Sequence, residues 1–532
     1  MGILDTPAAP MPRASKNPLT GYYHVRGYGA VGDTNTNNDT AVNTLIAQVI
    51  ASGGGTVYFD SDPFIQRPVY RMDQMIINGQ GNIDLEIKAA PDVVIKPAPL
   101  STTDFIIISS GSTSTTDGTF LRRLRLTDLV IQSQGHSMSG TKIDRRAITI
   151  SQAQDVTLRN VKIAGFKRGA LILTDCFDSY FNDVEIKWSG YGLDNSNYAH
   201  AIQFLGSLDN SNNNRFTNLH MEQCPMMMLF DNNSRQNSFV NSKFEDGTET
   251  EKNTSTISPF YFKQSIETMF TGGFFSVDYT SDVPVIRTDD NSNSYLTTYN
   301  VRQAVKFSNL LLFANSLNKA RWFVGYNTEF SNVTVQRAYG SSAGFAFDFA
   351  SRNTFRGGSI TMATNDSNFF RITGDNNVLD KPTLVTFGDG AGASTAAITL
   401  SSGATRNYLD YLITGSVGNE FSAGPAFGTA GTLGNNIVVN ARDNNASTSG
   451  GGQKNVLHKE YLKLTDGSAQ TYTGFLNGFT GQKITIFATT ANVTLQHGTT
   501  ANAIAMKSGA NVPLATNETR TFVNIDGVWR EN

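Results

Sequence analysis

The sequence is poor in cysteine and has no long apolar run. Its 532 residues include two cysteines, Cys176 and Cys224, which follow no CxxC or metal-ligand spacing. We therefore expect two buried free thiols rather than a disulfide framework or a zinc site. No apolar run approaches the ~18 residues that a membrane span needs, so membrane insertion is not expected. The first twelve residues lack the basic and then apolar pattern of a secretion signal.

Charge is also scarce. Charged residues make up 16% of the chain, and 42 basic against 45 acidic residues leave a net charge of −3. A nucleic-acid-binding footprint is therefore not expected. Glycine and uncharged polar residues are abundant instead, and 34 phenylalanines stand against 3 tryptophans. This composition favours an all-β, turn-rich chain over a helical one.

One short pattern occurs twice between residues 214 and 246. Residues 214–222 read NRFTNLHME, and residues 237–245, which begin 23 positions later, read NSFVNSKFE. Each copy has an apolar ring, then Asn, then a triplet in which Met221 or Phe244 lies between two polar residues. A repeat of about 20–30 residues that holds one such strand is typical of a solenoid.

The same pattern extends along the chain from about Thr119. An apolar residue, one spacer and then Asn, Asp or Gly recur every 22 to 37 residues. The triplets are 126–128, 158–160, 180–182, 216–218, 239–241, 270–272, 307–309, 330–332 and 355–357. A base of about 22–25 residues per coil, with the excess as loops, fits a solenoid with insertions. We expect the phenylalanines to stack inside as a ladder and the asparagines to pair their amides at the turns.

The N-terminal segment, residues 21–60, has a glycine-containing stretch at 28–33, apolar residues at helical spacing over 41–50, and the run Gly53–Gly55. Asp39 is the expected helix N-cap, and the glycine run ends the helix. This combination resembles the N-terminal cap of pectate-lyase-like right-handed β-helix proteins, as found in phage tail spikes and related polysaccharide-active enzymes. A helix at an open solenoid end would cover exposed core and strand edges.

The C-terminal segment changes character. Residues 483–487, 493–496 and 520–525 alternate like sandwich strands, and 526–530 reads as a hairpin turn with an aromatic anchor. This stretch resembles the small C-terminal β-domain that closes trimeric tail spikes. The predicted fold is an all-β, right-handed parallel β-helix solenoid with an N-terminal helical cap and a small C-terminal β-domain. Its predicted parts are a flexible leader (1–20), the cap and first coils (21–118), the β-helix (119–425) and a trimerisation or carbohydrate-binding domain (426–532).

The repeated triplets supply the candidate catalytic residues. Equivalent residues of successive coils stack at about 4.8 Å, which would bring Glu222 over Glu245 and His220 over Lys243. Two carboxylates so close cannot both ionise freely, so one should hold its proton near neutral pH. Such a pair is what cleavage of a glycosidic bond requires. A solvated polar face, which solenoids carry on every coil, is the alternative.

Further candidates would bind the substrate. The loop 188–198 carries Trp188 and Tyr191, which would either form an aromatic wall for sugar rings or simply pin the loop. A second polar loop, 246–267, leaves the stack directly after Glu245. Arg168 is a basic group available to a polyanionic partner. No acidic calcium cluster is evident, so neither a metal nor another cofactor is expected.

The resemblance to tail spikes implies a virion tail protein that acts on capsule or O-antigen polysaccharide at the bacterial surface. Hydrolysis by Glu222 and Glu245 ranks first, a lyase with His220 or Lys243 as base second, and a non-catalytic receptor-binding spike third. Asp278, Glu329 and Asp348 are reserve acids. Outward apolar residues such as Phe274 and Leu311 need covering, so a homotrimer is expected. Attachment to the phage tail or baseplate is part of the same expectation.

Overall fold

The computed structural model describes residues 21–62, 64–98, 104–114, 119–133, 142–191, 199–232, 234–245, 257–277, 283–289, 305–314, 321–338, 345–362, 369–386, 396–401, 404–414, 419–423, 437–443, 447–448, 451–455, 461–476, 478 and 480–532. The chain divides into two compact units, Met1–Lys306 and Phe307–Asn532.

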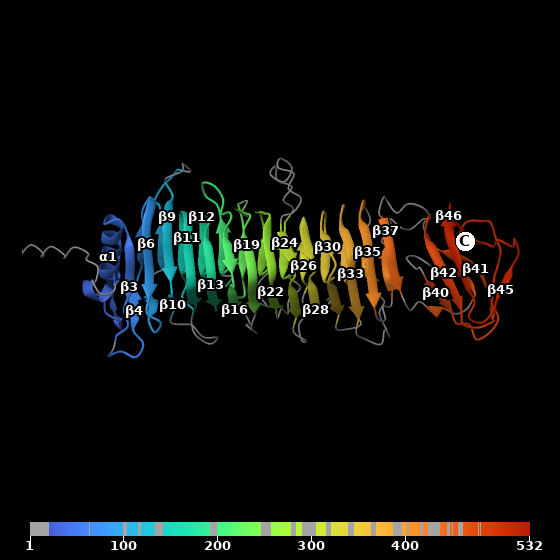
Figure 1. Cartoon of the computed structure of the whole chain (residues 1–532), viewed down its shortest axis with the longest axis horizontal. Coiled ribbons are helices and arrows are strands. Elements are labelled where there is room, and N and C mark those ends of the chain that lie inside the picture. The colour runs from blue at the N-terminus through green and yellow to red at the C-terminus, as the bar shows by residue number, and fades with distance from the viewer. Residues whose placement is uncertain are drawn as a thin grey trace, which may run out of the picture. The chain divides into compact units, whose positions relative to one another are not determined.

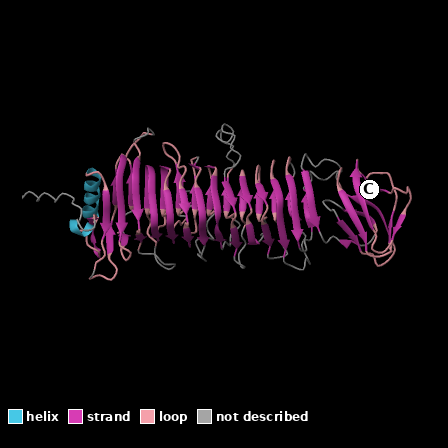
Figure 2. Cartoon of the chain, viewed as in Figure 1, coloured by secondary structure: helices cyan, strands magenta, loops and turns pink. Residues whose placement is uncertain are grey.

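The first unit begins around one helix. α1 (Asp39–Ala51) buries four apolar side chains against β3 (Gly55–Phe59) and β5 (Met75–Asn78), and it lies at the N-terminal end of this unit's strands (Figures 1 and 2). As predicted, it ends just before Gly53, whose φ of 91° suits glycine. The predicted N-cap is wrong by one residue. Asn38 occupies it, and the Asp39 carboxylate instead accepts the backbone N–H of Asp73 at 2.8 Å.

The remaining elements of this unit are a short 3₁₀ helix, η1 (Val25–Tyr28), and a long series of strands. The strands besides β3 and β5 are β1 (Tyr23–His24), β2 (Asp33–Asn37), β4 (Val69–Met72), β6 (Gly81–Ala89), β7 (Val94–Pro97), β8 (Ile106–Ser109), β9 (Leu121–Thr127), β10 (Val130–Gln132), β11 (Ile148–Ala164), β12 (Leu171–Phe177), β13 (Tyr180–Lys187), β14 (Ile202–Leu205), β15 (Arg215–Thr217), β16 (His220–Glu222), β17 (Met228–Phe230), β18 (Ser234–Arg235), β19 (Ser238–Glu245), β20 (Phe260–Phe262), β21 (Ser265–Ile266), β22 (Thr268–Val277) and β23 (Ile286–Thr288).

These strands pair in parallel with the next coil and form three faces, as in a parallel β-helix. The first, the ladder sheet, runs through β3, β6, β9, the middle of β11, and the starts of β13, β19 and β22, with β15 between β13 and β19. The second, the site sheet, runs through β2, β4, β7, β10 and β16 and the ends of β11, β13, β19 and β22. The third face contains β5, β8, the start of β11, β12, β14, β17, β20 and β23.

The phenylalanine ladder is confirmed. Phe181, Phe216, Phe239 and Phe270 stack in turn with ring centroids 4.3, 4.8 and 4.5 Å apart. The predicted alignment of one coil is wrong by one residue, because Phe181 rather than Tyr180 pairs with Phe216. Tyr180 points outward and is 40% exposed.

At the bend between the ladder sheet and the site sheet, one residue of each coil has a left-handed backbone conformation. Asp128, Asn160, Asp183, Asn218 and Asn241 have φ values from 52° to 57°, a conformation that Asn and Asp tolerate better than most residues. The Asn160 amide donates to the Asp128 carboxylate at 2.9 Å, and the Asn218 amide donates to Asp183 at 3.0 Å. These two pairs join an amide to a carboxylate, whereas the predicted amide–amide pairing occurs in the second unit, where the Asn332 amide donates to the Asn309 side chain at 3.3 Å.

The second unit also consists of strands, and β24 (Val305–Ser308) straddles its start. Its strands are β25 (Leu311–Ala314), β26 (Phe323–Gly325), β27 (Thr328–Ser331), β28 (Thr334–Ala338), β29 (Phe347–Phe349), β30 (Thr354–Arg356), β31 (Ser359–Met362), β32 (Phe370–Ile372), β33 (Val378–Thr386), β34 (Ala396–Leu400), β35 (Tyr408–Thr414), β36 (Asn419–Ala423), β37 (Ile437–Asp443), β38 (Ser447–Thr448), β39 (Gly452–Asn455), β40 (Tyr461–Leu464), β41 (Gln470–Leu476), β42 (Lys483–Ala488), β43 (Val493–Leu495), β44 (Ile504–Ala505), β45 (Val512–Leu514), β46 (Thr519–Ile525) and β47 (Val528–Glu531).

Within this unit, β25 to β37 continue the parallel coil pattern, and β38 to β47 form two smaller sheets. β46 pairs antiparallel with β42 and, through the turn Asp526-Gly527, with β47, so the predicted hairpin is confirmed. Its aromatic anchor, Trp529, is fully buried and donates its indole N–H to the Phe475 carbonyl at 3.0 Å. No helix in the described parts of the chain is long and apolar enough to cross a membrane.

Candidate active site

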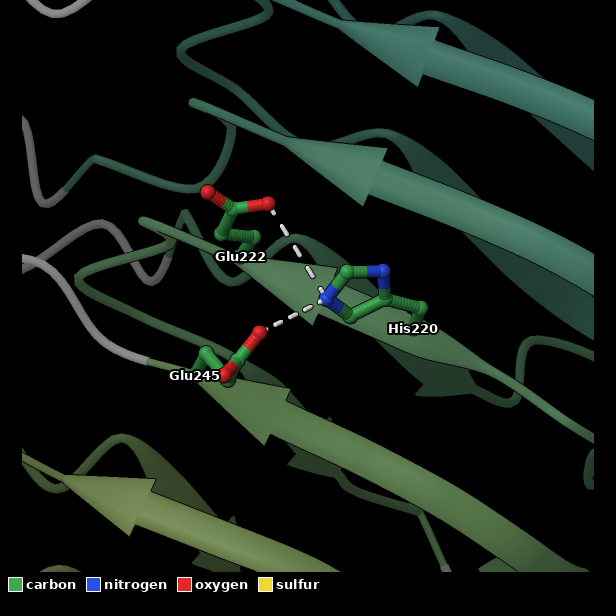
Figure 3. Close-up of side chains that lie close together, drawn as sticks. All are labelled: His220, Glu222 and Glu245. Atoms are coloured by element: carbon green, nitrogen blue, oxygen red, sulfur yellow. Dashed lines mark hydrogen bonds and ion pairs between the residues drawn. The ribbon is translucent and has the colours of Figure 1, made fainter.

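The predicted register of the site strands is confirmed. On the site sheet, β16 lies beside β19, and the paired residues are His220 with Lys243 and Glu222 with Glu245. Met221 is fully buried between the two outward side chains of β16, as the alternation of a strand requires. His220, Glu222 and Glu245 converge on one spot outside the sheet (Figure 3). Their ligand-type atoms all lie within 4.8 Å of one another.

Glu245 is held by two nitrogen donors. Its Oε2 atom lies 2.8 Å from the Lys243 ammonium and 3.0 Å from His220 Nε2. Partial burial acts to raise the pKa of Glu245, but the hydrogen bonds from Lys243 and His220 outweigh it, and the pKa is lowered. The expectation that one carboxylate holds its proton near neutral pH is therefore wrong for Glu245.

Glu222 is held in a similar way by a lysine from the preceding coil. Its Oε2 atom lies 2.7 Å from the Lys187 ammonium and 3.9 Å from His220 Nε2. In both glutamates a lysine thus holds Oε2, whereas Oε1 has no polar partner among the described residues. Each carboxylate keeps one oxygen for another group.

Sequence reasoning missed the charged residues on the coils before Glu222. Lys187 lies 2.7 Å from Glu185 as well as from Glu222, and the Lys162 ammonium lies 3.2 Å from the other Glu185 oxygen. Hydrogen bonds to these two lysines outweigh partial burial and lower the pKa of Glu185. The signal was present in the sequence. With Phe181 aligned to Phe216, Glu185 and Lys187 fall opposite His220 and Glu222.

Two of the predicted substrate-binding residues have other roles. Tyr191 is only 3% exposed and lies beneath the Lys142 ammonium, 4.9 Å from its ring centre, so the predicted sugar-stacking role is wrong. Arg168 forms a two-pronged ion pair with Asp144 at 2.8 and 2.9 Å, and among the described residues it makes no ion pair with Glu222 or Glu245.

Trp188 connects the ends of two site strands. Its indole N–H donates to the Gln223 side chain, and its backbone N–H donates to the Glu222 carbonyl at 3.2 Å. The alternative in which Trp188 fastens the chain is thus the one its contacts support. Loop residues 192–198 and 246–256 lie outside the described residues.

The remaining candidates lie elsewhere. Phe274 is partly buried. It lies one coil after Lys243 and is its register partner, so it occupies the expected outward position. Asp278 lies outside the described residues, while Glu329 and Asp348 belong to the second unit and are buried. Asp348 is bound by Arg321 at 2.6 Å and by Arg371 at 3.1 Å, which gives it a structural partner on each side.

The His–Glu–Glu group contains donor types that metal ions accept. However, Lys187 and Lys243 already donate to the two Oε2 atoms. A bound cation would therefore compete with two ammonium groups. Both cysteines are free and buried, as predicted, and burial raises the pKa of the Cys176 thiol to about 12.

Comparison with known proteins gives two family matches and a distant relative. Residues 22–256 match the family described as rhamnogalacturonase A/epimerase, pectate lyase-like, and residues 438–530 match the phage depolymerase C-terminal β-sandwich domain. Depolymerase 1 of Klebsiella phage KN3-1, described as capsule KN3-specific, is 23% identical over 523 residues. The match covers 96% of this chain and 63% of that protein, so the chain spans less than two thirds of its relative's length.

Two solved structures of phage proteins match this chain at low similarity. ORF18 of Geobacillus virus E2 has a TM-score of 0.48 at 16% identity, over 63% of this chain and 60% of that one. Tailspike protein 3 of bacteriophage CBA120 has a TM-score of 0.45 at 11% identity, over 81% of this chain and 64% of that one. The chain is thus similar to pectate-lyase-like proteins over residues 22–256, to phage depolymerases over residues 438–530, and to one capsule-specific phage depolymerase over most of its own length.

Proposed function

We propose that this chain is a phage tail spike that depolymerises bacterial capsule or O-antigen polysaccharide by endo-acting hydrolysis. Glu222 and Glu245 would be its catalytic pair. The observation that carries the proposal is their arrangement. Two half-buried carboxylates from successive coils lie together, each with Oε2 held by a lysine and Oε1 without a partner among the described residues. Oriented carboxylates of this kind suit proton transfer to and attack on a glycosidic centre.

The two glutamates would take different roles. Glu245, whose pKa is lowered, stays ionised and attacks the anomeric carbon as the nucleophile. Glu222 protonates the leaving glycosidic oxygen, then removes a proton from the water that releases the sugar from Glu245. His220, between the two, positions Glu245 through its 3.0 Å contact. Cleavage of each glycosidic bond consumes one water molecule.

The spacing favours retention of anomeric configuration. Oxygens of the two carboxylates lie within 4.8 Å of each other, nearer the ~5 Å of retaining enzymes than the ~6.5–9.5 Å of inverting ones. Proton NMR of the first products tests this directly. Initial release of the inverted anomer would contradict the assignment of a nucleophile.

The central experiment compares chain shortening with binding. Wild-type protein is screened on purified bacterial capsules and O-antigens, and product size is followed by mass. Glu222→Gln and Glu245→Gln should each abolish shortening while binding persists. If wild-type protein shortens none of the polysaccharides yet binds one, the chain is a non-catalytic receptor-binding spike.

A lyase is the second candidate, because Lys187 and Lys243 bind the two glutamates that His220 also contacts. In that reaction His220 or Lys243 removes a proton beside a uronate carboxylate, and a lysine neutralises that carboxylate. Products would then carry a new double bond that absorbs ultraviolet light. Appearance of this absorbance would replace the hydrolase proposal with the lyase.

The proposal includes the biological setting. The spike would attach to the phage tail or baseplate and act at the bacterial cell surface as a homotrimer. A trimer would cover partly exposed apolar side chains such as Phe274. Light scattering that gives the mass of a single chain would contradict this part.

A further inference from the structure

We infer that Lys187 is a positioning residue for Glu222. This inference deepens the proposed function and rests on it for the catalytic role of Glu222. The Lys187 ammonium lies 2.7 Å from Glu222 Oε2 and 2.7 Å from Glu185 Oε1, so it bridges two successive coils of the site sheet. Lys187 binds Oε2 of Glu222 as Lys243 binds Oε2 of Glu245.

Lys187 points outward from the site sheet but is more covered than Lys162 and Lys243. Its side chain is 27% exposed, whereas the Lys162 side chain is 57% exposed and that of Lys243 is 48% exposed. Partial burial acts to lower the pKa of Lys187, but hydrogen bonds to Glu185 and Glu222 outweigh it, and the pKa is raised. Lys187 therefore stays a cation with two of its three donors used on carboxylates.

The backbone fixes the two ends of this contact. Lys187 and Glu222 are register partners on β13 and β16, and the next backbone N–H, that of Trp188, donates to the Glu222 carbonyl at 3.2 Å. Lys187 thus holds the Glu222 side chain at Oε2, and the Trp188 backbone N–H holds the Glu222 main chain at its carbonyl oxygen. Among the described residues, Oε1 of Glu222 has no polar partner, so the proposed function assigns this oxygen to the substrate.

Glu185 supports Lys187 in turn. It lies two residues earlier on the same strand and therefore on the same face, and its second oxygen is 3.2 Å from Lys162. The chain Lys162–Glu185–Lys187–Glu222 alternates in sign over three coils. Because Lys162 lies at the exposed end of this chain and is separated from Glu222 by Glu185 and Lys187, it offers a matched control of the same charge.

The test compares Lys187→Met, Lys187→Arg and Lys162→Met on the capsule polysaccharide that wild-type protein shortens. Lys187→Met should lower kcat about 10- to 100-fold with KM nearly unchanged, because a lost hydrogen bond to a charged group is of that order. The alkaline limb of the pH–rate profile, on which the general acid Glu222 loses its proton, should move to higher pH. Lys187→Arg should recover part of kcat, and Lys162→Met should stay within about twofold.

A second readout does not depend on activity. Carbodiimide coupling with glycine ethyl ester, followed by peptide mass spectrometry, reports how readily each carboxyl reacts. Lys187→Met should increase labelling of Glu222 relative to Glu245, with unchanged circular dichroism. Unchanged labelling together with unchanged kcat would overturn the inference, and so would equal losses in Lys187→Met and Lys162→Met. If the proposed hydrolysis itself is wrong, Glu222→Gln keeps full activity while the labelling difference still appears.

Discussion

Removal of one ring from the phenylalanine ladder should loosen the coils that carry the glutamates. Phe239 is the second residue of β19, whose far end holds Glu245, and it is 1% exposed. Its ring stacks on Phe216 at 4.8 Å and on Phe270 at 4.5 Å. A buried phenylalanine truncated to alanine loses about 3–5 kcal/mol through lost burial and the cavity left behind. Because two ring stacks are lost together, Phe239→Ala should fall at the upper end of that range.

The next residue provides the control. Val240 points outward from the same strand and is 39% exposed, so Val240→Ala should cost no more than about 0.5 kcal/mol. Amide hydrogen exchange read by mass spectrometry reports local opening of β15, β19 and β22 without requiring two-state unfolding of the whole chain. Phe239→Ala should speed exchange there by about 100-fold or more, since each 1.4 kcal/mol is tenfold. If both variants exchange alike, the ladder does not hold these coils together.

Three other outcomes follow from the structure. Gly273→Ala would place a Cβ 2.1 Å from the Ser242 carbonyl oxygen at a φ of 110°, so it should lower the thermal midpoint far more than Gly81→Ala, where φ is 70° but the space is open. Cys176 should resist iodoacetamide at pH 8 until the protein unfolds, as mass spectrometry will report. The lowered pKa of Glu245 stabilises the fold above its ordinary value of 4.5, and this contribution is lost as pH falls through the folded value. Lys243→Met should therefore shift acid unfolding, followed by circular dichroism, to higher pH.

The coil architecture was predictable because its signal repeats. A single triplet of an apolar residue, a spacer and Asn, Asp or Gly says little, but nine of them fix both the strand period and the turn. The same periodicity placed Glu222 opposite Glu245 before any coordinates, since register follows from the ring that must be buried.

The misses have local causes. In the coil at 180–183 two aromatic residues are adjacent, and alignment on Tyr180 instead of Phe181 shifted that coil by one residue. A shift of one residue moves every side chain to the other face, and for this reason Lys187 and Glu185 went unnoticed. Tyr191 was misread because burial depends on neighbours such as Lys142 that lie far away in sequence. The lowered pKa of Glu245 likewise reflects its donors, which a pair of carboxylates considered alone does not reveal.

The register of the site sheet has a consequence for how specificity can diversify. Positions 185 and 187, 220 and 222, 243 and 245, and 274 and 276 present the same pair of outward directions on successive windings. An acid at 276 would face Glu245 as Glu245 faces Glu222. Point substitutions at these positions could therefore move a pair of facing acids from one winding to the next, while the backbone that supports them stays unchanged.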